Sequence, residues 1–298
     1  MPLTFDLKTY LEDKRHEIDS ILETLIQNQP GYASKVCEAM RYSLMAGGKR
    51  LRPILMIAGA QALAKPYTPL LPAACAIECI HTYSLIHDDL PAMDDDDLRR
   101  GQPTCHKIYG EAVAILAGDG LLTLAFEILA KENKDIPDSL NMKATYLIAK
   151  AAGIAGMVGG QCADIESEGK SLNQEELLYI HSHKTAAMIR VSLEAAAVLC
   201  NASPEDQKAL ADFGNNLGLA FQIRDDLLDI EGTEEQIGKR TGSDLKKHKA
   251  TYPALFGMEQ AREKARDLIN TALDKIEKFG RDAEPLRAIA KYVVDRNR

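Results

Sequence analysis

The chain has 298 residues, of which 46% are hydrophobic and 27% charged, enough for a large buried core in one large domain or two small ones. Its formal net charge of −8 argues against nucleic acid or an anionic membrane surface as a general partner. An anionic substrate must therefore be met by local clusters of lysine and arginine, or through a bound metal ion.

The sequence also bears on the compartment. The six cysteines show no metal-binding spacing, and Cys75 and Cys79 lie one helical turn apart in an apolar stretch, as expected of buried thiols in a reducing environment. No window approaches eighteen uninterrupted apolar residues, and the first residues show neither a secretory signal nor a transit peptide pattern. We therefore expect a cytoplasmic protein without stable membrane association.

Apolar residues recur at three- and four-residue steps along most of the chain. This pattern predicts helices over the ranges 7–27, 31–44, 51–64, 110–131, 144–160, 175–200 and 205–230. A further apolar helix follows Pro66, Pro69 and Pro72 and ends in acidic residues. Since no alternating run of β-branched residues is convincing, the sequence predicts an all-α bundle forming one domain over residues 1–298.

Six carboxylates lie within the ten residues from Asp88 to Asp97, directly before Arg99 and Arg100. Carboxylates this close raise one another's pKa unless a cation neutralises them. The preceding residues 79–86 are largely apolar, so the cluster ends a buried helix, where uncompensated anions are costly. A hard divalent cation such as Mg²⁺ would compensate them. A solvated acidic loop is the alternative.

A second acidic cluster ends another apolar helical stretch. Asp225 and Asp229 are four residues apart and project from one helix face, with Asp226 between them. Either cluster alone could be a solvated helix end. Two clusters, each behind an apolar helix, could face across the mouth of one bundle and bind metal ions jointly.

Positive charge occurs in small separate groups. Residues 47–53 place three cations beside the flexible pair Gly47 and Gly48 at a helix junction, a plausible anion-binding site. Arg99 and Arg100 follow the first acidic cluster, and two other basic segments are Lys184 with Thr185 and residues 238–242. Each alone could be a solvated basic patch. Beside two clusters of the type that binds Mg²⁺, together they suggest a substrate with more than one diphosphate.

With these motifs in this order, the sequence resembles the short-chain trans-isoprenyl diphosphate synthases, and most closely the bacterial farnesyl type. The resemblance covers nearly the whole chain. It rests on residues 47–53, 88–100, 118–119, 159–161 with Asp164, 184–185, 221–222 with 225–229, and 238–239.

The resemblance implies a homodimer of all-α subunits, each an isoprenoid-synthase-type helix bundle around a deep central cavity. It implies a prenyltransferase that joins isopentenyl diphosphate to dimethylallyl or geranyl diphosphate and yields farnesyl diphosphate. The implied metal ligands, for three Mg²⁺ ions, are Asp88, Asp94 and Asp225, with Asp89 and Asp229 as supports.

The resemblance also implies the substrate contacts. The residues expected at the allylic diphosphate are Arg99, Lys184 and Lys239. Those expected at the diphosphate of isopentenyl diphosphate are Gly48, Lys49, Arg52, His81 and Arg100. Alone, His81 would be read as an ordinary core histidine. Residues 292–298 resemble a family C-terminus that closes over the isopentenyl site.

The chemistry needs no protein nucleophile. Cleavage of an allylic carbon–oxygen bond leaves a carbocation and a highly charged leaving group, so catalysis consists of stabilising the departing diphosphate and excluding water. The double bond of isopentenyl diphosphate then attacks, and a proton is lost to diphosphate oxygens. By resemblance, Thr185 and Gln222 face the cation with negative dipole ends, and Phe221 adds an aromatic face.

Two features of the first cluster bear on geometry and product length. Asp88 and Asp94 would lie about 120° apart on an ideal helix, so we expect a helix distorted at Pro91. Tyr83, with Ser84 beside it, lies five residues before the first aspartate, where by resemblance an aromatic ring stops the growing tail at fifteen carbons. An ordinary core tyrosine is the alternative.

Three other functions stay open. A geranylgeranyl or other chain-length synthase would share every motif. A terpene cyclase would share the fold and first acidic motif, but its second motif mixes Asn or Asp, Ser or Thr, and Glu, unlike Asp225, Asp226 and Asp229 here. A non-catalytic subunit that binds divalent cations would be expected to lack one aspartate motif or the segment 47–50, and neither is missing.

Overall fold

The computed structural model describes residues 5–27, 34–170, 172–231 and 251–295. Helices dominate these residues, which confirms the predicted all-α class. The first half comprises α1 (Leu7–Gln27), α2 (Ser34–Leu44), α3 (Leu51–Ala62), the short 3-10 helix η1 (Thr68–Leu70), α4 (Leu71–Asp88), α5 (Cys105–Tyr109) and α6 (Glu111–Ala130). The second half comprises α7 (Asp138–Ala152), α8 (Met157–Ser167), α9 (Gln174–Ile180), η2 (His181–Ala186), α10 (Ala187–Leu199), α11 (Pro204–Glu231), α14 (Tyr252–Phe256), α15 (Met258–Lys275), η3 (Glu277–Ala283) and α16 (Glu284–Asp295).

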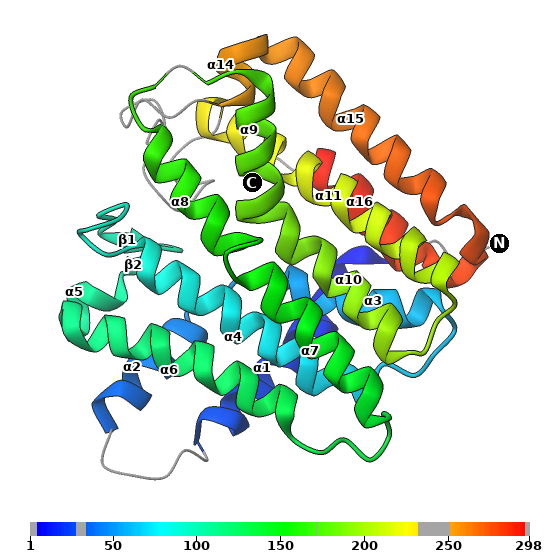
Figure 1. Ribbon diagram of the computed structural model, residues 1–298, viewed down its shortest axis with the longest axis horizontal. Coiled ribbons are helices and arrows are strands. Elements are labelled where there is room, and N and C mark those ends of the chain that lie inside the picture. The colour runs from blue at the N-terminus through cyan, green and yellow to red at the C-terminus, as the bar shows by residue number, and fades with distance from the viewer. Residues whose placement is uncertain (1–4, 28–33, 171, 232–250, 296–298) are drawn as a thin grey trace.

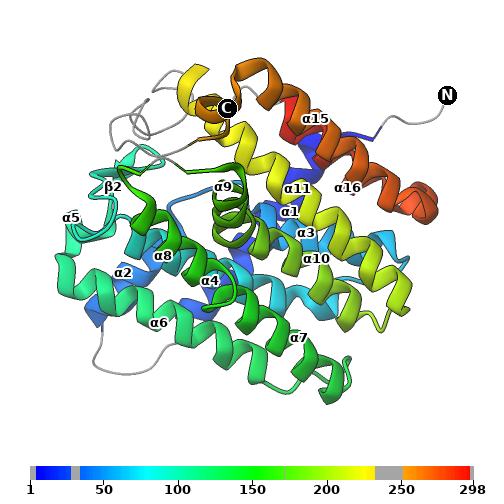
Figure 2. The ribbon, with the colours of Figure 1, turned by 45° about the horizontal axis from the view of Figure 1, so that its top comes forward.

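The helices form a bundle whose two sides share a middle layer. In both views α6 and α7 lie along one edge and α15 along the opposite edge, with α4, α10 and α11 between them (Figures 1 and 2). Helices α3 and α10 contribute to two buried apolar clusters at once. Met56 and Met188 belong to the cluster around α4 and α6, whereas Leu55 and Leu193 belong to the cluster around α11, α15 and α16. These two helices are therefore apolar nearly all round, as buried central helices must be.

Most predicted ranges match the observed helices, but the range 144–160 is wrong. The structure has two helices there, because α7 ends at Ala152 and α8 begins at Met157. Gly153 has extended backbone angles, Gly156 has angles that are neither helical nor extended, and the added Cβ of an alanine at Gly156 would lie 2.0 Å from the carbonyl oxygen of Ala151. Glycine permits this break, which the alanine-rich composition conceals.

The predicted helix 175–200 is continuous but not uniform. The six residues His181–Ala186 form a π-helical turn between α9 and α10. A π turn accommodates one residue more than an α-helical turn and occurs mostly at functional sites. It lies in the segment that carries Lys184 and Thr185.

The only strands among the described residues form a two-residue hairpin. Leu98–Arg99 (β1) pairs antiparallel with Gln102–Pro103 (β2), directly after the first acidic cluster. Asp95, Arg100 and Gly101 have positive φ angles around this hairpin, so the chain reverses sharply there. The reversal turns Arg99 and Arg100 back toward the end of α4.

Two described helical stretches, Thr68–Asp88 and Glu111–Ala130, are long and apolar enough to cross a membrane. In the first, 72% of the most apolar window is buried, as in a core helix of a globular protein. In the second the buried share is 39%, so α6 also presents an apolar outer face. Length and composition alone are weak grounds for a membrane span.

Candidate active site

The first acidic cluster begins where α4 ends. The expected distorted helix is not found, because α4 stops at Asp88 and residues 89–94 form turns that contain Pro91. Proline disfavours helical geometry at the residue before it and removes a helical donor, which accounts for the stop. The backbone N–H of Asp94 donates to the carbonyl oxygen of Asp88 at 2.8 Å. The turn therefore brings Asp94 back to Asp88 rather than leaving it far around a helix.

The carboxylate of Asp88 is partly buried and lies close to the negative charges of Asp94 and Asp89. The pKa of Asp88 is raised to about 6, chiefly by burial and also by the negative charges of Asp94 and Asp89, while Lys184 and Arg99 act in the opposite direction. A carboxyl group with this environment favours a nearby cation. The donor set consists of hard oxygens, which suits Mg²⁺ or a similar ion.

The other acidic residues of this cluster pair with nearby cations. Asp89 is buried and accepts a hydrogen bond from Arg99 Nε at 2.9 Å, and Arg99 also lies 3.2 Å from Asp96. Asp97 pairs with Lys107 at 2.7 Å. Arg99 is thus fixed by two carboxylates beside Asp88. Asp89 acts here as the anchor of an arginine.

The second acidic cluster lies at the end of α11. Asp226 is buried and joins three segments: it accepts from Gln222 Nε2 at 3.0 Å and from the backbone N–H of Tyr252 at 2.8 Å, and it lies 3.4 Å from His181 Nε2. Asp229 is also buried, whereas Asp225 is partly exposed. The middle aspartate therefore holds the motif in place, and Asp225 is the more accessible carboxylate.

The π-helical turn faces this cluster. Lys184 Nζ lies 2.6 Å from Asp164 Oδ2 of α8, and Thr185 Oγ1 donates to Gln222 Oε1 at 2.7 Å. The backbone of this turn packs directly against α8 on one side and against α11 on the other. A Cβ at Gly160 would lie 2.2 Å from Lys184 N, and a Cβ at Gly218 would lie 2.6 Å from Ala186 Cα. Glycine at both positions is required for this approach.

The basic segment before α3 adopts an unusual backbone. Gly47, Gly48 and Arg50 all have positive φ angles. Arg50 is fully buried and donates to Asp19 Oδ1 at 2.7 Å, to Glu78 Oε1 at 2.8 Å and to the carbonyl oxygen of Leu44 at 2.6 Å. These three bonds hold a left-handed arginine, which costs energy outside glycine. Arg50 is thus a strut for the segment rather than a free cation.

Three predicted binding residues gather beside this strut. The Arg100 guanidinium lies over Gly48, where a Cβ would come within 2.5 Å of its Cζ, and it donates to the carbonyl oxygen of Gly47. Arg52 lies near Arg100, Glu78 and Asp225. Burial lowers the pKa of His81 well below its usual range, and Arg52 and Arg100 lower it further, so His81 is neutral. The structure places these cations between the two acidic clusters.

Lys49 and Phe221 lie beside the C-terminal helix α16. Lys49 Nζ lies 5.4 Å from the ring centroid of Tyr292 in α16, and the two residues line a cavity of about 20 Å³ together with Phe221. The C-terminal helix therefore contacts the predicted isopentenyl side of the site. The rest of the predicted C-terminal cover, residues 296–298, lies outside the described residues, as does Lys239.

The predicted chain-length residues lie one turn before the first cluster. Tyr83 is 7% exposed, and its ring meets the ring of His87 edge-on, with centroids 5.7 Å apart. Ser84 Oγ donates to the carbonyl oxygen of His81 at 2.9 Å, so its hydroxyl is occupied by its own helix. Of the two, Tyr83 is the bulky group at this level of α4.

The geometry defines a site with two acidic clusters, a strip of arginines between them and a lysine on a distorted helical turn. Among the described residues, no three His, Cys, Asp or Glu side chains converge closely enough to hold a metal ion unaided. Such a site suits enzymes that act on diphosphates.

Comparison with known proteins specifies the class further. The sequence pattern of the family described as Polyprenyl synthetase matches residues 33–291, and the chain belongs to this family. Enzymes of this family are prenyltransferases that act on small isoprenoid diphosphates and generally depend on a divalent metal.

Individual relatives are similar over nearly their whole length. The chain is 49% identical to the farnesyl diphosphate synthase of Geobacillus stearothermophilus, covering 98% of both chains. It is 46% identical to the geranylgeranyl diphosphate synthase of Cyanophora paradoxa, covering 98% of this chain and 97% of the other. A solved structure described as an FPP/GFPP synthase from Zymomonas mobilis has a TM-score of 0.87 at 38% identity, covering 97% of this chain and 98% of that one.

Glu78, His181 and Asp226 have roles in the structure that are not predicted from the sequence. Glu78 could have been found, because it is the one charged residue within residues 71–80, an otherwise apolar helical stretch. Asp226 belongs to the second acidic cluster, but its task there comes from a contact between α11 and the π-helical turn, and His181 carries no comparable signal in the sequence.

Proposed function

We propose that this chain condenses isopentenyl diphosphate with dimethylallyl diphosphate and then geranyl diphosphate, releasing diphosphate and forming farnesyl diphosphate. The observation that carries this proposal is the neighbouring pair of Arg52 and Arg100, since Arg52 lies within electrostatic reach of Asp225 and Arg100 within reach of Asp89. Two anion-binding groups, one next to each acidic motif, suit two diphosphate substrates held side by side. The similarity to farnesyl diphosphate synthases favours the same product.

Mg²⁺ would be held by Asp88 and Asp94 on one side and Asp225 on the other, with Asp229 in support and three ions in all. When bound, it neutralises the leaving diphosphate as a Lewis acid. The raised pKa of Asp88 supports this assignment, because a neighbouring cation removes the repulsion that the crowded carboxylates otherwise suffer.

The side chains of the chain itself have distinct tasks in this mechanism. Arg99 and Lys184 hold the allylic diphosphate by charge-assisted hydrogen bonds, and Lys239 is assigned the same task by resemblance alone. Arg52, Arg100, Lys49 and neutral His81 hold the diphosphate of isopentenyl diphosphate. The turn at Gly48 lets the Arg100 guanidinium lie against the backbone.

The carbocation is stabilised by polar groups whose orientation is fixed. Gln222 donates to Asp226 through Nε2, which turns Oε1 toward Thr185 and leaves one of its lone pairs available. The dipole of this amide oxygen favours positive charge nearby. Phe221 adds an aromatic face. With no protein base assigned, the proton leaves to the diphosphate oxygens.

Product length distinguishes the farnesyl from the geranylgeranyl function. Relatives of both kinds are similar to this chain at comparable identity, so overall similarity does not separate them. The buried aromatic ring of Tyr83 favours a fifteen-carbon limit, because a smaller residue would leave space for a longer tail.

We also infer a single domain that pairs as a homodimer. The shared helices α3 and α10 support one domain. Large apolar side chains stay exposed on α6, α7 and the turn after α7, namely Ile115, Leu116, Met142, Tyr146 and Ile154. Large apolar side chains that are exposed on neighbouring helices favour an interaction surface there. Light scattering of the purified protein tests the dimer. The cytoplasmic location stays a prediction.

The decisive experiment is incubation with Mg²⁺, labelled isopentenyl diphosphate and each allylic primer in turn, followed by chromatography of the dephosphorylated products. Farnesol from both primers supports the proposal. A twenty-carbon main product would establish the geranylgeranyl alternative, and cyclic hydrocarbons would establish a cyclase. An absence of condensation would contradict both synthase functions.

A further inference from the structure

His87 lies between α4 and α6, one helical turn beyond Tyr83. Its Nε2 lies 3.1 Å from the carbonyl oxygen of Ile115, within hydrogen-bond distance, and 3.9 Å from Asp119 Oδ1. The imidazole is therefore attached to the neighbouring helix and does not swing freely at the end of α4. It is not among the residues that the proposed mechanism uses.

The attachment depends on a missing side chain in α6. A Cβ built on Gly118 would lie 2.1 Å from His87 Nε2 and 2.5 Å from its Cδ2. Real Cβ atoms do not approach other atoms this closely, so the ring occupies the space that glycine leaves open. Gly118 is helical, and glycine weakens a helix relative to alanine, so its presence here requires such a packing reason.

The other side of the imidazole meets Tyr83. The two rings are 5.7 Å apart between centroids with an interplanar angle of 77°, an edge-on arrangement that aromatic pairs favour. The ring of His87 thus transmits the position of α6 to the side chain of Tyr83. Without His87, Tyr83 would lose the neighbour that limits its rotation on the side of the acidic cluster.

We propose that His87, seated against Gly118, is a positioning residue that holds the Tyr83 ring and thereby sets product length. This inference rests on the proposed function and on Tyr83 as the residue that stops the growing tail. It adds that Tyr83 stops the tail only because α6, through His87, holds the Tyr83 ring in place.

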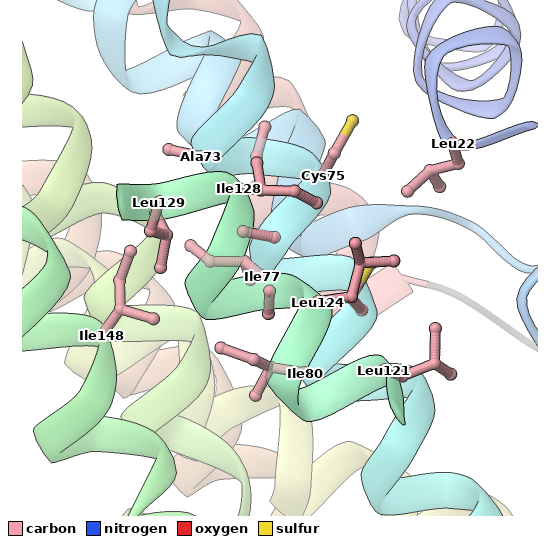
Figure 3. Close-up of a cluster of buried hydrophobic side chains, with 14 of the residues drawn as sticks. Leu22, Ala73, Cys75, Ile77, Ile80, Leu121, Leu124, Ile128, Leu129 and Ile148 are labelled. Atoms are coloured by element: carbon pink, nitrogen blue, oxygen red, sulfur yellow. The ribbon is translucent and has the colours of Figure 1, made fainter. Parts of the chain in front are cut away.

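The part of α4 before Tyr83 packs closely against α6. Figure 3 shows Ile77 and Ile80 of α4 beside Leu124 and Ile128 of α6, and all four are buried. One helical turn is about 5.4 Å, comparable to the length of one isoprene unit. We expect release of the Tyr83 ring to let the tail lengthen by about one such unit.

The test compares His87→Ala with the parent chain, using labelled isopentenyl diphosphate and geranyl diphosphate. We expect the twenty-carbon fraction of the total product to rise several-fold. Gly118→Ala, which displaces the imidazole by a different route, should shift the product in the same direction. Asp119→Asn is the matched control, since it removes only the charge near the ring and should retain the parent distribution. Because fractions are compared, partial loss of folded enzyme does not alter the result.

A double variant separates a direct role from an indirect one. In a Tyr83→Ala background, His87→Ala should add no further lengthening, since the side chain that it positions is absent. Lengthening of the same size in both backgrounds would overturn the proposal, as would a parent-like distribution for His87→Ala.

A readout without turnover distinguishes this inference from the proposed function. Fluorotyrosine labelling gives a ¹⁹F resonance for Tyr83, assigned by its absence in Tyr83→Phe. His87→Ala should shift or broaden this resonance, and Asp119→Asn should leave it in place. An unmoved resonance overturns the positioning role whatever the enzyme makes, whereas a moved resonance in a chain without condensation activity would contradict only the proposed function.

Discussion

Lys184 Nζ lies 2.6 Å from Asp164 Oδ2, and this ion pair connects the π-helical turn to α8. The same lysine lowers the pKa of Asp88, so its charge also reaches the first acidic cluster. A single ammonium group therefore connects α8, the π turn and the end of α4.

Lys184→Ala should lower kcat/KM for the allylic diphosphate by about a hundredfold, the usual cost of losing one group that stabilises developing negative charge. Lys184→Arg retains the charge and should recover part of the loss. Steady-state kinetics with geranyl diphosphate varied at saturating isopentenyl diphosphate measures both. Equal activity of Lys184→Ala and the parent would contradict the diphosphate assignment.

Asp225→Ala should lower the condensation rate by orders of magnitude while the protein stays folded and dimeric, because a metal-dependent leaving group is no longer neutralised. Asp212→Ala, on the same helix and more than three turns away, is the control and should retain turnover. Initial rates at saturating Mg²⁺, with thermal unfolding curves, test this. Near-normal turnover of Asp225→Ala would show that the carboxylate holds no essential ion.

Tyr83→Ala should lengthen the product beyond fifteen carbons. The substitution removes the bulky ring that α4 presents five residues before Asp88. Chromatography of the dephosphorylated products measures the shift. If farnesol stays the only product, another residue forms the floor of the cavity.

Acid should destabilise the fold through His181. Burial lowers the pKa of this imidazole from 6.5 to about 4, while Asp164 raises it and Lys184 lowers it; Asp226 lies 3.4 Å away. Below pH 6.5 this histidine is protonated in the unfolded chain, whereas in the folded chain it stays neutral until about pH 4. The free energy of unfolding therefore falls as the pH falls from 6.5 to about 4. The contribution is on the order of 3 kcal/mol.

His181→Gln removes this contribution. Urea unfolding at pH 7.5 and pH 5 should show a smaller loss of stability for the variant than for the parent. Asp88, whose raised pKa has the opposite effect in the same window, is present in both proteins and largely cancels in the comparison. An identical pH dependence would mean that His181 does not stay neutral in the folded chain.

Gly160→Ala should destabilise the fold by about 1–3 kcal/mol and lower turnover, because the new methyl group meets the backbone of Lys184 rather than a flexible side chain. Gly120→Ala is the matched helical control, since its Cβ would meet the flexible end of Met40. Thermal unfolding and kcat are the measurements. If both variants behave alike, the close approach of α8 to the π turn is not required.

The sequence predicts well those features that repeat along the chain. The bounds of α1 follow directly from its apolar spacing, and both acidic clusters were expected where apolar helices end. The break between α7 and α8 was concealed, because alanine-rich composition continues across Gly153 and Gly156. Periodicity is a property of neighbours in sequence, so it identifies helices better than it identifies their interruptions.

The candidate site divides in the same way. Residue types and spacing indicated the two acidic clusters and the basic groups, and the family resemblance singled out Asp88, Asp94 and Asp225. The roles of Glu78 and Asp226 depend on partners far away in the chain. The turn that returns Asp94 to Asp88 also escaped prediction, because a proline after a helix is compatible with either a kink or an end. Contacts between distant segments require the folded structure.

The π-helical turn at His181–Ala186 sets a tolerance for insertions and deletions. Because it contains one residue more than an α-helical turn, deleting a single residue there would let α9 and α10 join as one regular helix. All residues before the deletion would then rotate by about 100° relative to those after it. Either Lys184 would lose its ion pair with Asp164 of α8, or Thr185 would lose its hydrogen bond to Gln222. The length of this turn is therefore as constrained as the identity of its residues.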